Sequence, residues 1–206
     1  MPRSPIQNEQ MRAESRQKIV STARRLFAQR GYDRCNVSDI AREAGMSQGN
    51  IYWYFSSKEE ILKAVLANAF EALGKLLSEV NAHPGTGIEK LNTLIERYID
   101  FGERQGGAEI TIIVTSLIGQ GGLQRLSDLD IDTTQIGAGV QQLVAKLLVE
   151  AQAEGAILPG LDPNLLAMLF PSLFNGLVIT YRNHLADIPR EALHAAVLRL
   201  LGSGEK

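Results

Sequence analysis

Apolar residues recur at helical spacing along most of the chain, and this pattern predicts an all-α protein. In the first segment, about residues 11–30, four of them fall on one helical face: Ile19, Ala23, Leu26 and Phe27. Gly31 follows and suits the left-handed conformation that ends a helix. The short β-prone run at residues 110–114 lies among helical neighbours, and no segment alternates convincingly as a strand would, so we expect no sheet.

Three further helices are expected before residue 81. The second covers about residues 37–44 and ends at Gly45. The third begins at Ser47, a favourable N-cap residue, and reaches about residue 55. The fourth opens at Ser57, which forms a capping box with Glu60. Later helices are predicted near residues 88–105, 108–120, 134–155, 162–185 and 189–201, with breaks at the glycine pairs 106–107 and 121–122.

A short Gly-Met-Ser connection joins the second and third predicted helices. Two helices joined by a tight turn that contains glycine have the geometry of a helix-turn-helix. The second helix of that motif enters the major groove of DNA, and its N-terminal residues meet base edges. Gln48 and Asn50 stand at this position, and both amides bond bidentately to adenine. Gly49 between them would let the backbone approach the DNA closely.

Three consecutive aromatic residues follow these amides, and they include the one tryptophan of the chain. Tyr52, Trp53 and Tyr54 cannot all point into a core from one helix. Their hydroxyl and indole groups donate to phosphates, and their rings rest on sugars and thymine methyl groups. Lys58 adds a cation beside the free amides of a helix start, which suits a phosphate. The alternative is that the aromatic residues pack the small domain against the rest of the chain.

The stretch VSDIAREAGMSQGNIYWYFSSKEEIL resembles the DNA-binding motif of the TetR (tetracycline-repressor-like) family of transcriptional regulators. It matches the Ile-Ala pair, Ala-Gly, the Ser cap, Gly, the hydrophobic-Tyr pair, the aromatic-Phe pair and Lys-Glu. The preceding IVSTARRLFAQRGYDRCNV fits the family's first helix, so the resemblance covers about residues 14–63. Tyr54 stands where many members have His, and Asn36-Val37-Ser38 where many have Thr. By this resemblance Val37 and Ser38 join the predicted DNA-binding residues.

The resemblance implies an all-helical homodimer. Residues 1–60 would form an N-terminal three-helix DNA-binding domain, and residues 61–206 a C-terminal helical domain for ligand binding and dimerisation. Most such proteins are cytoplasmic repressors that leave their DNA when a small molecule binds. A dimer would place two recognition helices on half-sites about 34–36 Å apart, so a near-palindromic operator is expected.

Two predicted helices of the second domain carry the candidate dimer interface. Residues 162–185 contain two interleaved apolar rows, which together make a face too wide for one shallow contact. These helices could meet their symmetry mates as a four-helix bundle, or both rows could serve the chain's own core. The residues predicted to lie at the interface are Leu169, Leu173, Leu177, Leu193, Val197 and Leu200.

A ligand pocket is expected where polar or aromatic residues interrupt apolar helices. Pro171 lies inside such a helix, removes one backbone hydrogen bond and would bend it. A bend of this kind could line a cavity. Tyr98, Phe174 and Asn175 are the candidate pocket residues. Each of them could equally be an ordinary core or surface residue.

Charge and composition support this picture only weakly. Residues 1–63 hold 11 Lys/Arg against 7 Asp/Glu, whereas the remainder holds 10 against 16, so a basic end precedes an acidic body. The one cysteine fits a reducing compartment. The N-terminus lacks an apolar signal-peptide core, so we expect no export. We also expect no membrane span, because the chain has no apolar run near 18 residues.

Other functions are less well supported by the residues. The alternating Asp128, Asp130 and Asp132 lack the glycine and glutamate of a calcium loop, and no histidine has metal-ligand spacing, so no metal or cofactor is expected. No nucleophile and base stand out, which disfavours an enzyme. The alternatives that stay open are a regulator that needs no ligand, an activator, and an all-helical enzyme or adaptor.

Overall fold

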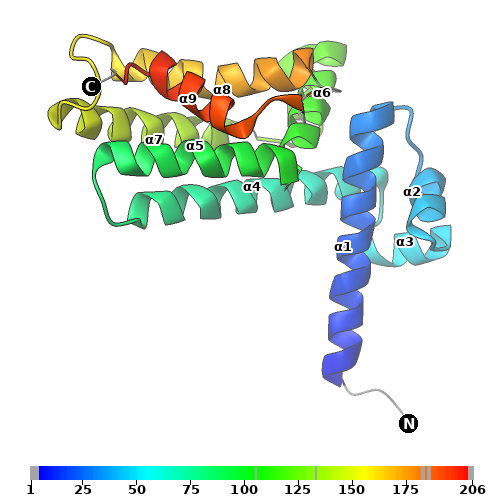
Figure 1. Ribbon diagram of the computed structural model, residues 1–206. Coiled ribbons are helices and arrows are strands. Elements are labelled where there is room, and N and C mark those ends of the chain that lie inside the picture. Colours follow the sequence, from blue (N-terminus) through cyan, green and yellow to red (C-terminus); the bar gives the residue numbers. More distant parts are fainter. Residues whose placement is uncertain (1–4, 105, 133, 182–183, 185–186, 204–206) are drawn as a thin grey trace. The chain divides into compact units, whose positions relative to one another are not determined.

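The computed structural model describes residues 5–104, 106–132, 134–181, 184 and 187–203, and this part of the chain is helical (Figure 1). Its elements are α1 (Pro5–Arg30), α2 (Val37–Ala44), α3 (Gln48–Tyr54), α4 (Lys58–Ala82), α5 (Gly87–Arg104), α6 (Gly107–Asp128), α7 (Thr134–Ala153), α8 (Pro163–Thr180) and α9 (Arg190–Leu200). The expected all-α fold is confirmed.

The chain folds as two compact units. Unit 1 contains Met1–Ala69 and Ile112–Ile131, and unit 2 contains Phe70–Thr111 and Asp132–Lys206. Two of the three boundaries, after Ala69 and after Thr111, fall inside α4 and α6, so each of these helices contributes to both units. The predicted domain boundary after residue 60 lies within α4 and stays a proposal.

The three-helix core of unit 1 forms where the apolar spacing predicts it. Ile19 on α1, Ile40 on α2 and Ile51 on α3 are fully buried. Gly45 ends α2 in the left-handed conformation, with φ of 65°. The Ser47 hydroxyl caps α3 by accepting a hydrogen bond from the Asn50 amide at 3.1 Å. The cap and the turn therefore fix where the third helix begins.

Three helix boundaries differ from the prediction. α1 starts at Pro5, earlier than the predicted residue 11. α6 runs unbroken through the glycine pair 121–122 to Asp128, because a glycine inside a helix costs only about 1 kcal/mol and neighbouring contacts can offset that. α8 ends at Thr180, before the predicted residue 185. Residues 105, 182, 183 and 185, which the predictions for α5 and α8 included, lie outside the described part of the chain.

In unit 2, α7 packs against α5 and α8, and α5 also contacts α9. The two apolar rows of α8 have different surroundings. Leu166, Phe170, Phe174 and Val178 are buried in the core of unit 2. The other side of α8 exposes large apolar residues: Leu165, Met168, Leu169 and Ile179.

The composition of α8 corrects one expectation from the sequence. Pro163–Thr180 carries no charged residue and is long and apolar enough to cross a membrane by length and composition alone. Helices from the cores of soluble proteins pass the same test. One face of α8 packs into unit 2, so its apolar character already has a structural use within the described residues.

Candidate DNA interface and effector cavity

The exposed surface of α3 brings together the amides and aromatic rings that the sequence singled out. Gln48, Gly49 and Asn50 are exposed at its first turn. Tyr52 and Trp53 are 49% and 60% exposed. The neighbouring apolar residue Ile51 points into the core, so α3 presents one polar and aromatic face to solvent. Exposed rings of this size beside amides suit contact with sugars, phosphates and base edges.

Three other predicted contact residues have different surroundings. Tyr54 is half-buried and meets the Trp53 ring edge-on, with centroids 4.7 Å apart. Ser38 is exposed on the first turn of α2. Val37 is buried, which corrects the prediction for its side chain, because its apolar group serves the core of unit 1. Any contact from Val37 would have to come from its backbone amide at the start of α2.

Lys58 has a structural role in addition to its predicted one. Its ammonium group donates to the backbone carbonyl of Tyr32 at 2.9 Å and to that of Asp33 at 3.5 Å. It also lies 4.2 Å from the centroid of the Tyr32 ring. Lys58 therefore ties the start of α4 to the turn that follows α1. An ammonium group has three donors, so these bonds leave room for one phosphate.

Charged side chains brace the remaining turns of the motif. Arg25 on α1 pairs with Glu43 on α2 at 2.7 Å. Glu60 accepts a hydrogen bond from the Ser56 amide at 2.7 Å, and this bond lowers the pKa of its carboxyl group. The Ser57 hydroxyl accepts from the Glu60 amide at 3.1 Å, so the predicted capping box is present with its return bond shifted by one residue. These contacts hold α3 between its neighbours.

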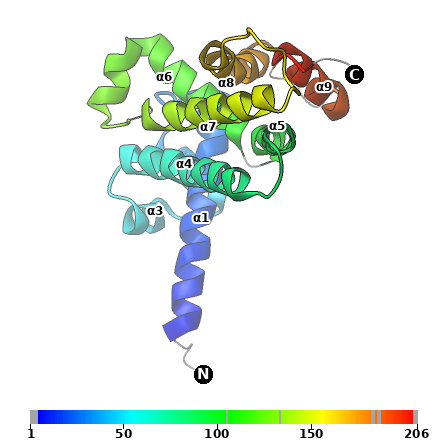
Figure 2. The same cartoon turned by 90° about the vertical axis from the view of Figure 1, so that its left-hand side faces the viewer.

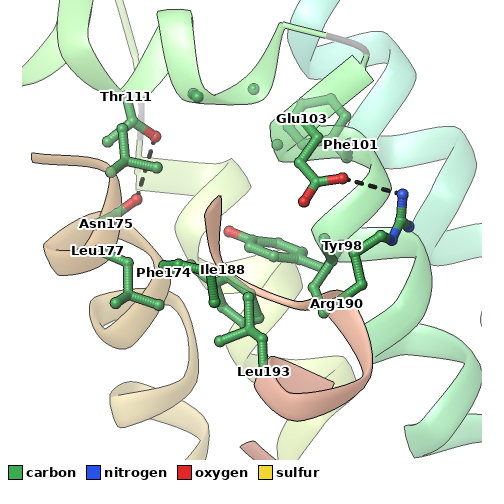
Figure 3. Close-up of a pocket in the computed structure, with 15 residues that line it drawn as sticks. Tyr98, Phe101, Glu103, Thr111, Phe174, Asn175, Leu177, Ile188, Arg190 and Leu193 are labelled. Carbon is green, nitrogen blue, oxygen red and sulfur yellow. Dashed lines mark hydrogen bonds and ion pairs between the residues drawn. The ribbon is translucent and has the colours of Figure 1, made fainter. Parts of the chain in front are cut away.

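Unit 2 contains a cavity of about 480 Å³ between α5, α6, α8 and α9 (Figure 3). The predicted pocket residues Tyr98, Phe174 and Asn175 all line it. The remaining lining is Ile99, Phe101, Gly102, Glu103, Gly107, Ala108, Thr111, Leu177, Val178, Ile188, Arg190 and Leu193. A cavity of this size and mostly apolar lining fits a small organic molecule. The structure therefore brings the three candidates to one site, and ligand binding by them stays a prediction.

Aromatic rings form one wall of the cavity. The Tyr98 ring lies 4.9 Å from Phe174 and 5.1 Å from Phe170, centroid to centroid. Burial raises the pKa of Tyr98 to about 12, so its hydroxyl is neutral at ordinary pH and remains a hydrogen-bond donor. At Gly107 a β-carbon would come within 2.5 Å of the Phe101 ring, so the glycine leaves space for this wall.

Two interactions between polar side chains lie in the lining of the cavity (Figure 3). The Thr111 hydroxyl donates to Asn175 at 3.2 Å. Arg190 pairs with Glu103 at 3.0 Å and with Asp100 at 3.5 Å. The single arginine in the lining is thus already neutralised by carboxylates. The arrangement favours a largely apolar molecule with an uncharged polar group, because a second anion would have to displace Glu103 or Asp100.

The sequence missed Glu103 and Arg190. They stand 87 residues apart, and each alone has the character of an ordinary surface residue. Arg190 precedes Leu193 in the last predicted helix, so its place near an apolar face could be seen from the sequence. A single sequence does not indicate which acidic residue faces it. Only the packing of α9 on α5 brings the pair together.

The predicted dimer residues divide into three groups. Leu169 and Leu200 are 53% and 63% exposed and stay candidates for a partner contact. Leu173 is half-buried, while the half-buried Leu177 and Leu193 line the cavity. Val197 is 1% exposed and belongs to the chain's own core, which corrects its assignment to an interface. Of the residues that the sequence predicts at the interface, only some are therefore exposed enough to contact a partner subunit.

Comparison with known proteins identifies the N-terminal region. The family described as "Bacterial regulatory proteins, tetR family" matches residues 19–65. The chain is 27% identical over 186 residues to the fatty acid metabolism regulator protein of Bacillus subtilis (strain 168), covering 90% of this chain and 93% of that protein. In both comparisons the aligned region includes the helix-turn-helix.

Two solved structures share the fold over most of its length. The ketosteroid transcriptional regulator KstR2 of Mycobacterium tuberculosis superposes with a TM-score of 0.73 at 21% identity, over 92% of this chain and 95% of that chain. AibR, solved in complex with isovaleryl coenzyme A and operator DNA, superposes with a TM-score of 0.70 at 18% identity, over 91% and 98%. The helix-turn-helix and the matching family description lead to one conclusion: residues 19–65 form a DNA-binding region of the kind found in the tetR family of bacterial regulatory proteins, and the chain is similar over most of its length to a transcriptional regulator.

Proposed function

We propose that the chain is a cytoplasmic repressor that binds a near-palindromic operator as a homodimer and leaves it when a small molecule fills the cavity. The observation that supports this proposal is that α6 extends from the cavity of unit 2 into unit 1. The helix begins in the cavity wall, at Gly107 and Thr111, and from Ile112 onward it belongs to unit 1. Just beyond its end, Asp130 holds Lys63 of α4 at 3.3 Å. One helix thus connects the cavity lining with the helix that follows α3.

The effector would act by shifting an equilibrium between two positions of α3. A ligand moves such an equilibrium only by its differential affinity for the two states. A molecule that fits the cavity better after the start of α6 has moved would favour the state in which α6 and α4 are shifted. In that state α3 would no longer be placed for operator binding. A coupling of about 1–3 kcal/mol weakens operator binding about 5- to 150-fold. The predicted release therefore needs no large conformational change.

The homodimer is supported by the exposed apolar side of α8. Leu165, Met168, Leu169 and Ile179 leave a row of large side chains without cover from the described residues. Soluble monomers seldom expose contiguous apolar surface of this kind. A twofold axis beside α8 would bury the row against its own copy. Leu169→Lys should then convert the dimer to a monomer in sedimentation and abolish binding to a two-half-site duplex.

The effector that best suits the cavity carries an acyl chain. Its wall is aromatic and aliphatic, and its arginine is already paired with Glu103 and Asp100, so the lining favours an uncharged carbonyl over a free carboxylate. The Tyr98 hydroxyl and the Thr111–Asn175 pair are the groups that could meet this carbonyl. The similar Bacillus subtilis protein is a fatty acid metabolism regulator, and AibR was solved with isovaleryl coenzyme A, so both point to acyl groups.

The decisive experiment is selection of bound duplexes from a random pool by the full-length protein. The expected result is a near-palindromic sequence bound by two subunits, with an uncharged decanoyl thioester that lacks the phosphates of coenzyme A weakening the complex at least fivefold. Free decanoate at the same concentration is the matched control and should have less effect. Binding without symmetry would contradict the dimer, and an operator complex indifferent to every acyl chain length would contradict the effector class.

A further inference from the structure

The N-terminal part of α1 is not needed for the three-helix core. The helix starts at Pro5, about four turns before Ile19, which is its first fully buried residue. The family description also matches only from residue 19 onward. Figures 1 and 2 both show this end of α1 extending past α3. The described residues before Ile19 are almost all exposed, so packing on the core does not account for this part of the helix.

Two arginines of this stretch lie against the end of the recognition helix. The guanidinium carbon of Arg12 is 4.8 Å from the Trp53 ring centroid, and that of Arg16 is 5.0 Å from the Phe55 ring centroid. Positions four apart lie on the same helical face, so both side chains extend from one side of α1. A cation over an aromatic ring is attracted by the ring's electron-rich face. Both guanidinium groups are therefore held next to α3.

Among the described residues these two arginines have no acidic partner, in contrast to other arginines of unit 1. Arg25 pairs with Glu43, and Arg42 pairs with Asp39. Within the described residues, the ring contacts of Arg12 and Arg16 are the only interactions found, and neither forms an ion pair. A guanidinium group that stacks on a ring keeps its N–H donors free at its edge. Each arginine is thus exposed, charged and oriented.

We propose that Arg12 and Arg16 extend the DNA interface onto α1 and bind the phosphate backbone beside the groove that α3 occupies. Trp53 and Phe55 hold the two side chains in place before DNA arrives, so less side-chain freedom is lost on binding. Phosphate contacts of this kind fix the register of a protein on the duplex without reading its sequence. The proposal uses the DNA binding of the family and adds to it a stretch outside the matched region.

The test measures duplex affinity against salt concentration for full-length variants. The probes are a labelled duplex selected from the random pool and an unrelated duplex of equal length. Arg12→Ala should weaken binding to both by a similar factor and reduce the slope of log K against log salt by about 1. Arg12→Lys should keep the slope. Lys18→Ala is the matched control, because Lys18 lies on the same exposed helix about a third of a turn away from the Arg12 face.

The intrinsic fluorescence of Trp53, the one tryptophan in the chain, gives an independent measure. Duplex should change this emission in the wild-type protein, and Arg12→Ala should require a higher duplex concentration for the same change. An unchanged salt slope in Arg12→Ala, together with a lower melting temperature, would overturn the proposal, since Arg12 would then only support the Trp53 ring. A loss confined to the selected duplex would also overturn it, because Arg12 would then read bases. A wild-type protein that binds no duplex at all would remove the DNA-binding function itself.

Discussion

The surface of α3 and the cavity of unit 2 are built over very different lengths of chain. The exposed residues of the first all lie within Gln48–Tyr54, and the helix is delimited by its N-cap at Ser47 and its C-cap at Phe55. The second requires α5, α6, α8 and α9, whose lining residues extend from Tyr98 to Leu193. Local turn chemistry is enough to form the first site, whereas the second exists only when the tertiary packing is complete.

The two sites also differ in what their side chains do for stability. Gln48, Asn50 and Trp53 are exposed and contribute little to the core of unit 1. Phe174 and Val178 line the cavity and are at the same time buried residues of unit 2. Substitutions in the DNA surface should therefore separate function from folding, while those in the cavity should couple them.

The largest effect is expected for Phe174→Ala. The ring packs between Tyr98 and Phe170, with centroids 4.9 Å and 5.2 Å away, and its loss leaves a void in the aromatic wall. We expect the free energy of unfolding to fall by about 3 kcal/mol, measured by urea denaturation. Leu91→Ala is the control for the loss of a core side chain away from the cavity, because Leu91 is fully buried but does not line the cavity. If Phe174→Ala were as stable as the wild type, the cavity wall would not be part of the core.

Alkaline pH tests the same coupling through Tyr98. Its pKa is raised to about 12 by burial, above the ordinary value near 10 in the unfolded chain. The folded state thus holds the phenolic proton more tightly, and stability should be complete below about pH 10 and decline as pH rises to about 12. The contribution of Tyr98 is about 2–3 kcal/mol. Tyr98→Phe removes the titrating group, so its stability, measured by urea denaturation, should not show this decline with pH. If the wild-type and Tyr98→Phe profiles of stability against pH coincided, the hydroxyl would not be buried.

The sequence separation of the residues that form a feature explains whether a single sequence predicts it. The all-helical class, the turn at Gly45 and the cap at Ser47 follow from local spacing and residue type, and all three are confirmed. Tyr98 and Asn175 were predicted to line a pocket because polar groups on apolar helices are unusual, and both line the cavity.

The failures concern contacts between distant segments. The Glu103–Arg190 pair depends on how α9 packs on α5, which no local pattern specifies. Val197 shows the same limit, because an apolar residue on a surface helix suits a partner or the chain's own core equally well by pattern. The break expected at glycines 121–122 was wrong, because glycine disfavours a helix interior by only about 1 kcal/mol and does not by itself end a helix.

Gln48→Ala tests whether the DNA surface is as independent of the core as its exposure indicates. Loss of a bidentate amide contact to a base costs about 1–3 kcal/mol of discrimination, so preference for the selected duplex should fall about 5- to 150-fold. Stability should stay within about 0.5 kcal/mol of the wild type. Gln29→Ala, an exposed glutamine on α1, is the control and should change neither quantity. An equal loss on every duplex would show that Gln48 contacts the backbone instead of a base.

Lys58→Ala is the smallest of these effects, and it tests a residue that combines stability with DNA contact, because the ammonium group braces Tyr32 and Asp33 and is also predicted to meet a phosphate. We expect a stability loss of about 1 kcal/mol, since the bonds are charge-assisted but partly exposed. The slope of log K against log salt should also fall by about 1. Lys58→Met keeps most of the apolar stem over the Tyr32 ring and removes the charge, so it isolates the contribution of the ammonium group. If both variants lost stability and kept the wild-type slope, Lys58 would belong with the bracing residues of the motif and its predicted phosphate contact would be wrong.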